Sequence, residues 1–173
     1  MIKKSQIEII ITGGTIDSYY DGAKDTVVTS EKSAIPNFLK NLKTNNIFSF
    51  HETCMKDSRS LNDKDLKKVL SIIEKTQAKE IIITHGTYTM PDTARFLSAN
   101  MKSKDKIIIL TGSMIPLIGF SPSDAPFNLG YSLASLKTTK PGVYVCMNGE
   151  IFSSSEVAKR ISEGKFVSVF NKN

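Results

Sequence analysis

The sequence predicts an α/β protein with a doubly wound, mostly parallel sheet and helices on both faces. Two features carry this prediction. Four short runs of β-branched and other apolar residues, without polar alternation, are typical of strands that are covered on both faces. Segments whose apolar residues recur at helical spacing separate these runs, and strands that alternate with helices indicate right-handed crossovers into one sheet.

The first half of the chain supplies two strands and two helices. Residues 8–12 (EIIIT) are an unbroken apolar strand, and residues 47–53 are a weaker one. Between them, residues 32–43 place four apolar side chains on one helical face. Residues 63–75 show the same spacing behind an Asn-Asp pair that is suited to cap a helix.

The centre of the chain continues the alternation. Residues 80–84 repeat the EIIIT strand, and residues 106–111 (KIIILT) form the next strand. The sequence Thr-Met-Pro-Asp that starts at Thr89 resembles a capping box with proline in the first turn. A helix is therefore predicted over residues 89–101.

The last part of the chain completes the predicted sheet. Residues 124–137 are expected to form the fourth helix, and residues 142–147 (GVYVCM) the fifth strand. Residues 150–173 predict a short hairpin and a late strand (FVSVF). Because no linker, repeat or low-complexity tract interrupts the pattern, residues 1–173 are expected to form a single domain.

Composition excludes several classes of protein. Hydrophobic residues make up 40% and charged residues 23%, which is ordinary for a soluble globular domain. The net charge is +6, but the lysines are scattered, so no nucleic-acid partner is predicted. No stretch is long enough for a membrane span and no signal peptide is recognised, so a cytoplasmic location is expected. Cys54 and Cys146 lack metal or redox spacing and are expected to be buried thiols.

The predicted fold indicates where a ligand would bind. In open α/β sheets, ligands bind beyond the carboxyl ends of the strands, near the point where strand order reverses. Three such loops carry small polar residues: GGTID after the first strand, HGTYT after the third and GSMIP after the fourth. The first two loops would bring Thr15 and Thr87 close to a common ligand.

These threonines allow two interpretations. The two glycines before Thr15 permit close backbone approach, so GGT can be a phosphate loop of a flavodoxin-like binder, although neither dinucleotide nor P-loop spacing is present. Alternatively, a threonine hydroxyl is a nucleophile if a base removes its proton. Lys159 is a candidate base if the tail folds back over the sheet, and a solvent-exposed lysine otherwise.

The sequence resembles the bacterial-type L-asparaginases, in their amino-terminal domain. The resemblance covers nearly the whole chain and keeps the family's order of motifs. Its matching segments are ITGGTID (11–17), DSRSLND (57–63), ITHGTYTMPDTARFL (83–97), IIILTGSMIP (107–116), SDAPFNL (123–129) and residues 157–159.

The resemblance implies hydrolysis of asparagine to aspartate and ammonia, with no metal or organic cofactor. Thr15 would be the nucleophile, Thr87 the second threonine and Lys159 the lysine that activates it, while main-chain N–H groups of both loops stabilise the oxyanion. Ser58 falls where the family binds the substrate α-carboxylate. The other substrate contacts are expected from Gly14, Asp57, Gly86, Tyr88, Tyr19 and Ser113.

Two departures from the family pattern affect the prediction. The family has an aspartate after the second threonine, where this chain has Tyr88, so selection for a substrate ammonium is expected to weaken. The sequence ends at Asn173, whereas the family continues into a smaller domain that lends an acidic group to the neighbouring site of the dimer. The lid tyrosine of the family has no unambiguous counterpart: Tyr19 and Tyr20 lie in the corresponding loop at a different spacing, and either one closes the site or simply packs.

Tyr88 therefore leaves three interpretations open: it fills space, accepts a substrate without an α-ammonium, or marks a site that no longer catalyses. The first predicted function is an amidohydrolase acting on asparagine or a related small amide. The alternative is a catalytically weak domain that binds a small acid or amide as a sensor or subunit. Exposed apolar side chains in the segment SMIPLIGF predict a homo-oligomer, with a dimer as the simplest form; they are Ile115, Leu117, Ile118 and Phe120.

Overall fold

A six-stranded sheet forms the centre of the protein in the computed structural model, which describes residues 6–170. Its strands lie in the order β4-β1-β5-β6-β7-β8; the first five are parallel and β8 is antiparallel to β7. The predicted fold class is therefore confirmed. The strands are β1 (Gln6–Gly13), β4 (Ile47–Lys56), β5 (Glu80–Thr84), β6 (Ile107–Thr111), β7 (Gly142–Met147) and β8 (Glu150–Ser153).

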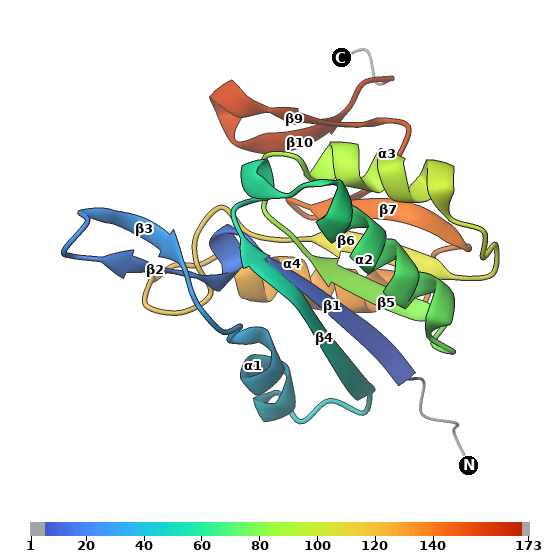
Figure 1. Cartoon of the computed structure of the whole chain (residues 1–173), viewed down its shortest axis with the longest axis horizontal. Helices are drawn as coiled ribbons and strands as arrows, with labels where there is room; N and C mark the ends of the chain where they lie inside the picture. Colours follow the sequence, from blue (N-terminus) through green and yellow to red (C-terminus); the bar gives the residue numbers. More distant parts are fainter. Residues whose placement is uncertain (1–5, 171–173) are drawn as a thin grey trace.

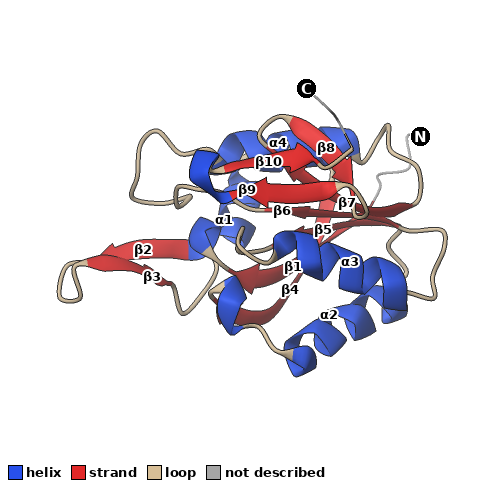
Figure 2. Ribbon diagram, turned by 90° about the horizontal axis from the view of Figure 1, so that it is seen from above, coloured by secondary structure: helices blue, strands red, loops and turns tan. Residues whose placement is uncertain are grey.

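Helices cover both faces of this sheet (Figures 1 and 2). Helices α2 (Asp63–Lys75) and α3 (Met90–Asn100) pack on one face, and α1 (Ile35–Asn41) and α4 (Ala125–Ser135) pack on the other. The chain runs outward from β1 to the edge strand β4, and then crosses to β5 and continues through β6 and β7. Strand order therefore reverses beside β1, which places the expected ligand crevice at the carboxyl ends of β1 and its neighbours.

The unbroken apolar runs follow from burial on both faces. Ile81 and Ile83 of β5 belong to the core beneath α2 and α3, whereas Ile82 belongs to the core beneath α1 and α4. All three side chains are fully buried. Burying an isoleucine side chain stabilises a protein by roughly 1.5–3 kcal/mol. Because the side chains on both faces of β5 gain this stabilisation, the strand is favoured in the middle of the sheet, where both faces are covered.

The best-predicted helix has a well-defined start. The Asn62 side chain accepts hydrogen bonds from the N–H groups of Lys64 (3.0 Å) and Asp65 (3.2 Å). The Asp65 carboxylate accepts one in return from the N–H of Asn62 at 3.1 Å. This reciprocal capping box explains why the predicted bounds of α2 agree with the structure.

The first helix is shorter than predicted because a side-chain contact fixes its start and a left-handed backbone conformation follows its end. The buried Asp17 carboxylate accepts hydrogen bonds from the Ser33 hydroxyl (2.8 Å) and from the N–H of Ala34 (2.9 Å), which hold the residues before α1 out of the helix. Burial raises the pKa of Asp17. At the other end, Lys43 has φ 50°, which is a left-handed conformation that ends a helix.

The capping box predicted at Thr89 is wrong. The Thr89 hydroxyl donates to the carbonyl of Ser58 at 3.0 Å and makes no hydrogen bond to its own helix. Tertiary contact thus replaces the local cap. The last predicted helix is also shorter than expected, since α4 ends at Ser135, whose carbonyl then accepts hydrogen bonds from the N–H groups of Thr138 and Thr139.

Two small antiparallel sheets lie outside the central one (Figure 1). The hairpin of β2 (Ser18–Asp21) and β3 (Thr26–Thr29) projects from the sheet and was not predicted, because its short strands carry exposed side chains. The tail folds into further strands: after β8 come β9 (Val157–Arg160) and β10 (Lys165–Ser168), and β10 ends two residues before the end of the predicted strand FVSVF. Residues 171–173 of the predicted tail lie outside the described residues.

Two predictions about exposure need correction. Leu117 is only 8% exposed, so the apolar surface expected in the segment SMIPLIGF does not include it. Cys146 is buried as expected, but Cys54 is half-buried; both thiols are free.

Among the described residues, no helix has the length and apolar character needed to cross a membrane.

Candidate active site

A small pocket lies where the carboxyl ends of β4, β1 and β5 meet. Its volume is about 220 Å³. Because β1 pairs with both β4 and β5, the loops that follow these three strands are neighbours. The described residues that line the pocket are Thr15, Asp57, Ser58, Arg59, Gly86, Thr87, Tyr88 and Lys159.

Glycine allows these loops to pack backbone against backbone. Gly14 has φ +85°, and a Cβ there would lie 2.4 Å from the Cα of Gly86. A Cβ on Gly86 would lie 2.7 Å from the Cβ of Ser58. Since real Cβ atoms do not approach other atoms so closely, only glycine fits at these two positions. The close packing brings Thr15, Ser58 and Thr87 around one pocket.

Lys159 reaches this pocket from the tail of the chain. Its Nζ donates a hydrogen bond to the Thr87 Oγ1 at 2.7 Å. Side chains two residues apart in a strand share a face, so Lys159 lies on the same side of β9 as the fully buried Val157. Arg95 of α3 donates to the carbonyl of Val157 at 2.6 Å and ties this strand to the central layer.

The surroundings of Lys159 favour its neutral form. Burial lowers the pKa of its ammonium group below the ordinary 10.5, and the nearby Arg59 lowers it further, while Asp57 opposes them. A lowered pKa increases the fraction of lysine that is free to accept a proton. The site therefore pairs a threonine hydroxyl with an amine suited to general-base chemistry.

The buried His85 ring holds the loop that carries Gly86 and Thr87 in place. The carbonyl of Gly86 lies 2.7 Å from Nδ1, so this nitrogen carries the proton and donates; the Thr93 hydroxyl, 3.0 Å from Nε2, then donates to the ring. Burial lowers the pKa of the imidazole from 6.5 to about 4. The ring is therefore neutral at pH 7 and fixes the peptide between Gly86 and Thr87.

A charged pair and an aromatic ring form the outer wall of the pocket. The Asp57 carboxylate accepts hydrogen bonds from Arg59 Nε (3.0 Å) and Nη2 (3.1 Å). The Arg59 guanidinium lies 5.6 Å from the centre of the Tyr88 ring, within the range of a cation–π contact. Arg59 was missed from the sequence, although it directly follows Ser58 in a loop at the end of a strand.

Comparison with known proteins identifies the family. The family model described as "Asparaginase, N-terminal" matches residues 6–169. The chain belongs to the asparaginase family. A glutaminase-asparaginase of Acinetobacter glutaminasificans is 34% identical over 92% of this chain and 51% of its own length. A probable periplasmic L-asparaginase of Haemophilus influenzae is 32% identical over 88% of this chain and 46% of its own length.

The fold of this asparaginase-family chain also agrees with a solved structure. The probable cytoplasmic L-asparaginase from Campylobacter jejuni superimposes with a TM-score of 0.81 at 30% identity, covering 95% of this chain and 53% of that one. The chain thus spans about half the length of the relatives it matches.

The structure of this asparaginase-family chain brings most of the expected site residues together. Three of them lie outside the pocket lining. Gly14 lies behind it against Gly86, and Tyr19 is 47% exposed on the projecting strand β2. Ser113 is buried, and its hydroxyl donates to the carbonyl of Ile115 at 2.6 Å.

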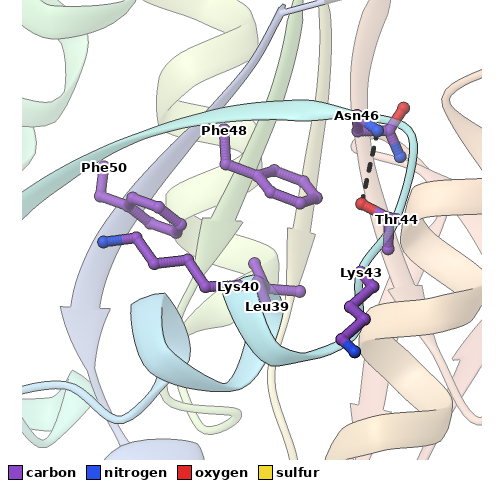
Figure 3. Close-up of a pocket in the computed structure, with 7 residues that line it drawn as sticks. All are labelled: Leu39, Lys40, Lys43, Thr44, Asn46, Phe48 and Phe50. Atoms are coloured by element: carbon purple, nitrogen blue, oxygen red, sulfur yellow. Dashed lines mark hydrogen bonds between the residues drawn. The ribbon is translucent and has the colours of Figure 1, made fainter.

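A second hollow of about 240 Å³ lies near the start of β4 (Figure 3). Phe48 and Phe50 face Leu39 and Lys40 of α1 across it, and the Lys40 Nζ lies 5.7 Å from the centre of the Phe50 ring. The residues described around it include no carboxylate or histidine to activate a nucleophile. In the described residues, no three His, Cys, Asp or Glu side chains are grouped to bind a metal.

Proposed function

We propose that this protein hydrolyses the amide of asparagine or a related small amide and releases ammonia. One observation carries the proposal: Lys159 donates to the Thr87 hydroxyl at 2.7 Å in the pocket that Thr15 also lines. An amine, two hydroxyls and glycine-rich loops are the parts that acyl transfer requires. Membership of the asparaginase family supports the same reaction.

The reaction divides into two halves with these residues in named roles. The Thr15 Oγ1 attacks the amide carbon and its proton passes to the pair of Thr87 and neutral Lys159. The C–N bond then breaks, and the leaving nitrogen takes up a proton and departs as ammonia. Water, deprotonated by the same pair, hydrolyses the ester, which regenerates the Thr15 hydroxyl and releases the acid.

Ammonia release from a panel of small amides tests this function. The panel contains L-asparagine, L-glutamine and small amides that lack an α-amino group. Turnover above the buffer background is the expected result. If no amide releases ammonia while the corresponding acids still raise the thermal midpoint, the alternative of a domain that binds a small acid is favoured. The observation that favours this alternative is Tyr88, a 51%-exposed phenol beside Thr87.

We also propose that the protein forms a homo-oligomer. Ile118 is 57% exposed and Phe127 58% exposed, and the Phe127 ring contacts that of Tyr131 on α4 with centroids 6.2 Å apart. Grouped apolar side chains of this kind are stabilised by a second copy of the chain.

A cytoplasmic location is proposed from the likeness to the Campylobacter jejuni protein, and cell fractionation tests it against the periplasm.

A further inference from the structure

The charges around the pocket are unevenly distributed. Among the described lining residues, Arg59 is a permanent cation, Lys159 is an amine whose pKa is lowered, and Asp57 is the single carboxylate. Asp57 is already paired: both of its oxygens accept from the Arg59 side chain, and Oδ1 also accepts from the N–H of Arg59 at 2.8 Å. These hydrogen bonds lower the pKa of Asp57 and keep it ionised. The described lining therefore offers a ligand no unpaired carboxylate.

Carboxylates just outside the lining have other partners. Asp17, after the first loop, is buried and bound to Ser33 and Ala34. Asp65 accepts from Lys56 Nζ at 2.7 Å. In the described part of the chain, neither group faces the pocket to receive an ammonium ion from a ligand.

Arg59 can bind a ligand carboxylate in addition to Asp57. The Asp57 side chain uses two of the five N–H groups of the guanidinium, on Nε and Nη2. The remaining N–H groups, on Nη1 and Nη2, are available to a ligand beside the Tyr88 ring, whose centre lies 5.6 Å from the guanidinium carbon. A planar donor group of this kind matches a carboxylate.

We propose, resting on the amidase function above, that the preferred substrate is a monoamide of a small dicarboxylic acid that lacks an α-ammonium group. Arg59 binds its carboxylate, its amide lies between Thr15 and Thr87, and Tyr88 covers the carbon that would carry the amino group of an amino acid. A pocket of 220 Å³ is below the usual range for drug-sized ligands and suits such a molecule. An α-ammonium would lie near the Arg59 guanidinium without a free carboxylate to offset the repulsion.

Succinamate and L-asparagine are the matched pair of probes, because they differ only in the α-amino group. The expected result is at least about a tenfold higher kcat/KM for succinamate with the wild-type protein. The variant Tyr88→Asp, which introduces a carboxylate beside Thr87, should remove or reverse that preference. Tyr88→Phe keeps the ring without adding a charge and should retain the preference. Equal or better turnover of asparagine by the wild type would overturn the proposal, including the case in which another chain supplies the missing carboxylate.

A binding measurement separates this proposal from the amidase function itself. If neither amide releases ammonia, the amidase function fails, and thermal shifts with succinate and L-aspartate at equal concentrations decide the ligand class. A larger shift with succinate, reversed in Tyr88→Asp, supports the proposal. An equal or larger shift with aspartate, or no shift with either acid up to about 10 mM, overturns it.

Discussion

Lys159 Nζ donates to Thr87 Oγ1 at 2.7 Å, although 72 positions separate the two residues in the chain. The contact exists because β9 returns over the carboxyl ends of the parallel strands and is fixed there by Val157 and Arg95. Burial lowers the pKa of the lysine in this position. The tail of the domain thus completes a pocket that the first two loops begin.

The first prediction concerns Lys159 as the base. Lys159→Arg retains the positive charge but removes the ability to give up a proton near neutral pH, so ammonia release should fall about 10²–10⁴-fold. Because the neutral amine is the active form, wild-type activity should rise with pH toward the lowered pKa of Lys159, below 10.5. Kinetics over pH 6–9 for wild type and Lys159→Arg check both points. An arginine variant with near wild-type turnover would exclude the role of a base.

The second prediction concerns stability in acid. The pKa of His85 is about 4 in the folded protein and 6.5 when the ring is exposed. Protonation of the ring therefore favours the unfolded chain wherever the pH is low enough for the unfolded ring to bind a proton. The contribution of neutral His85 to stability is complete above pH 6.5 and is lost as the pH falls to about 4, a total of about 3 kcal/mol. Urea unfolding at several pH values should show this loss, and His85→Gln should show a shallower dependence. An unchanged slope in the variant would contradict the assignment.

The third prediction concerns the contact between the loops. Gly14→Ala places a Cβ 2.4 Å from the backbone of Gly86, at φ +85°. Gly119 is the matched control, because it has φ +82° and no atom of residues 6–170 within 4 Å of its Cβ position. Gly119→Ala should cost about 1–2 kcal/mol for the left-handed conformation alone. Gly14→Ala should cost at least about 2 kcal/mol more, since packed backbone must move.

Urea denaturation of both variants measures this difference, and ammonia release reports on the pocket. Gly119→Ala should remain active, whereas Gly14→Ala should lose activity because Thr15 is displaced. Equal stability of the two variants would show that the loops are not packed as closely as the distances indicate.

The fourth prediction concerns self-association. Sedimentation of the wild type at micromolar concentration should give a species heavier than the 19.1 kDa chain. Phe127→Ser should shift the distribution toward the monomer, because it removes a large exposed ring from α4. Val27→Ser, on the projecting hairpin and 43% exposed, is the control and should not change it. A clean 19.1 kDa wild-type species would contradict the proposed homo-oligomer.

Sequence predicts the layers of this fold well where local and tertiary preferences agree. The bounds of α2, β5 and β7 match because apolar runs end at glycine, charge or a cap that is also used in the structure. Thr89 shows the opposite case, since its hydroxyl bonds to Ser58 in another loop instead of capping its own helix. The hairpin β2–β3 has too little buried apolar surface to leave a pattern.

The residues of the candidate site also fall into those that the sequence predicts and those that depend on tertiary structure. Thr15 and Thr87 were predicted to lie together because both follow strands of a parallel sheet, and β1 and β5 are neighbours. Lys159 was proposed only on condition that the tail folds back, because no local pattern encodes that return. Ser113 follows a parallel strand too, but β6 is one strand further from β1, and its hydroxyl is bound within its own loop.

Ammonia release by Thr15→Val, compared with wild type and Thr15→Ser, tests the central claim most directly. The claim that Thr15 is the nucleophile predicts a loss of at least about 10³-fold for valine, whereas serine, which keeps a hydroxyl, should retain measurable turnover. The thermal midpoint should change little, because Thr15 is half-buried at the start of a single 3-10 turn and is not part of the core. Retention of more than about a tenth of wild-type activity by a folded Thr15→Val protein would contradict the claim.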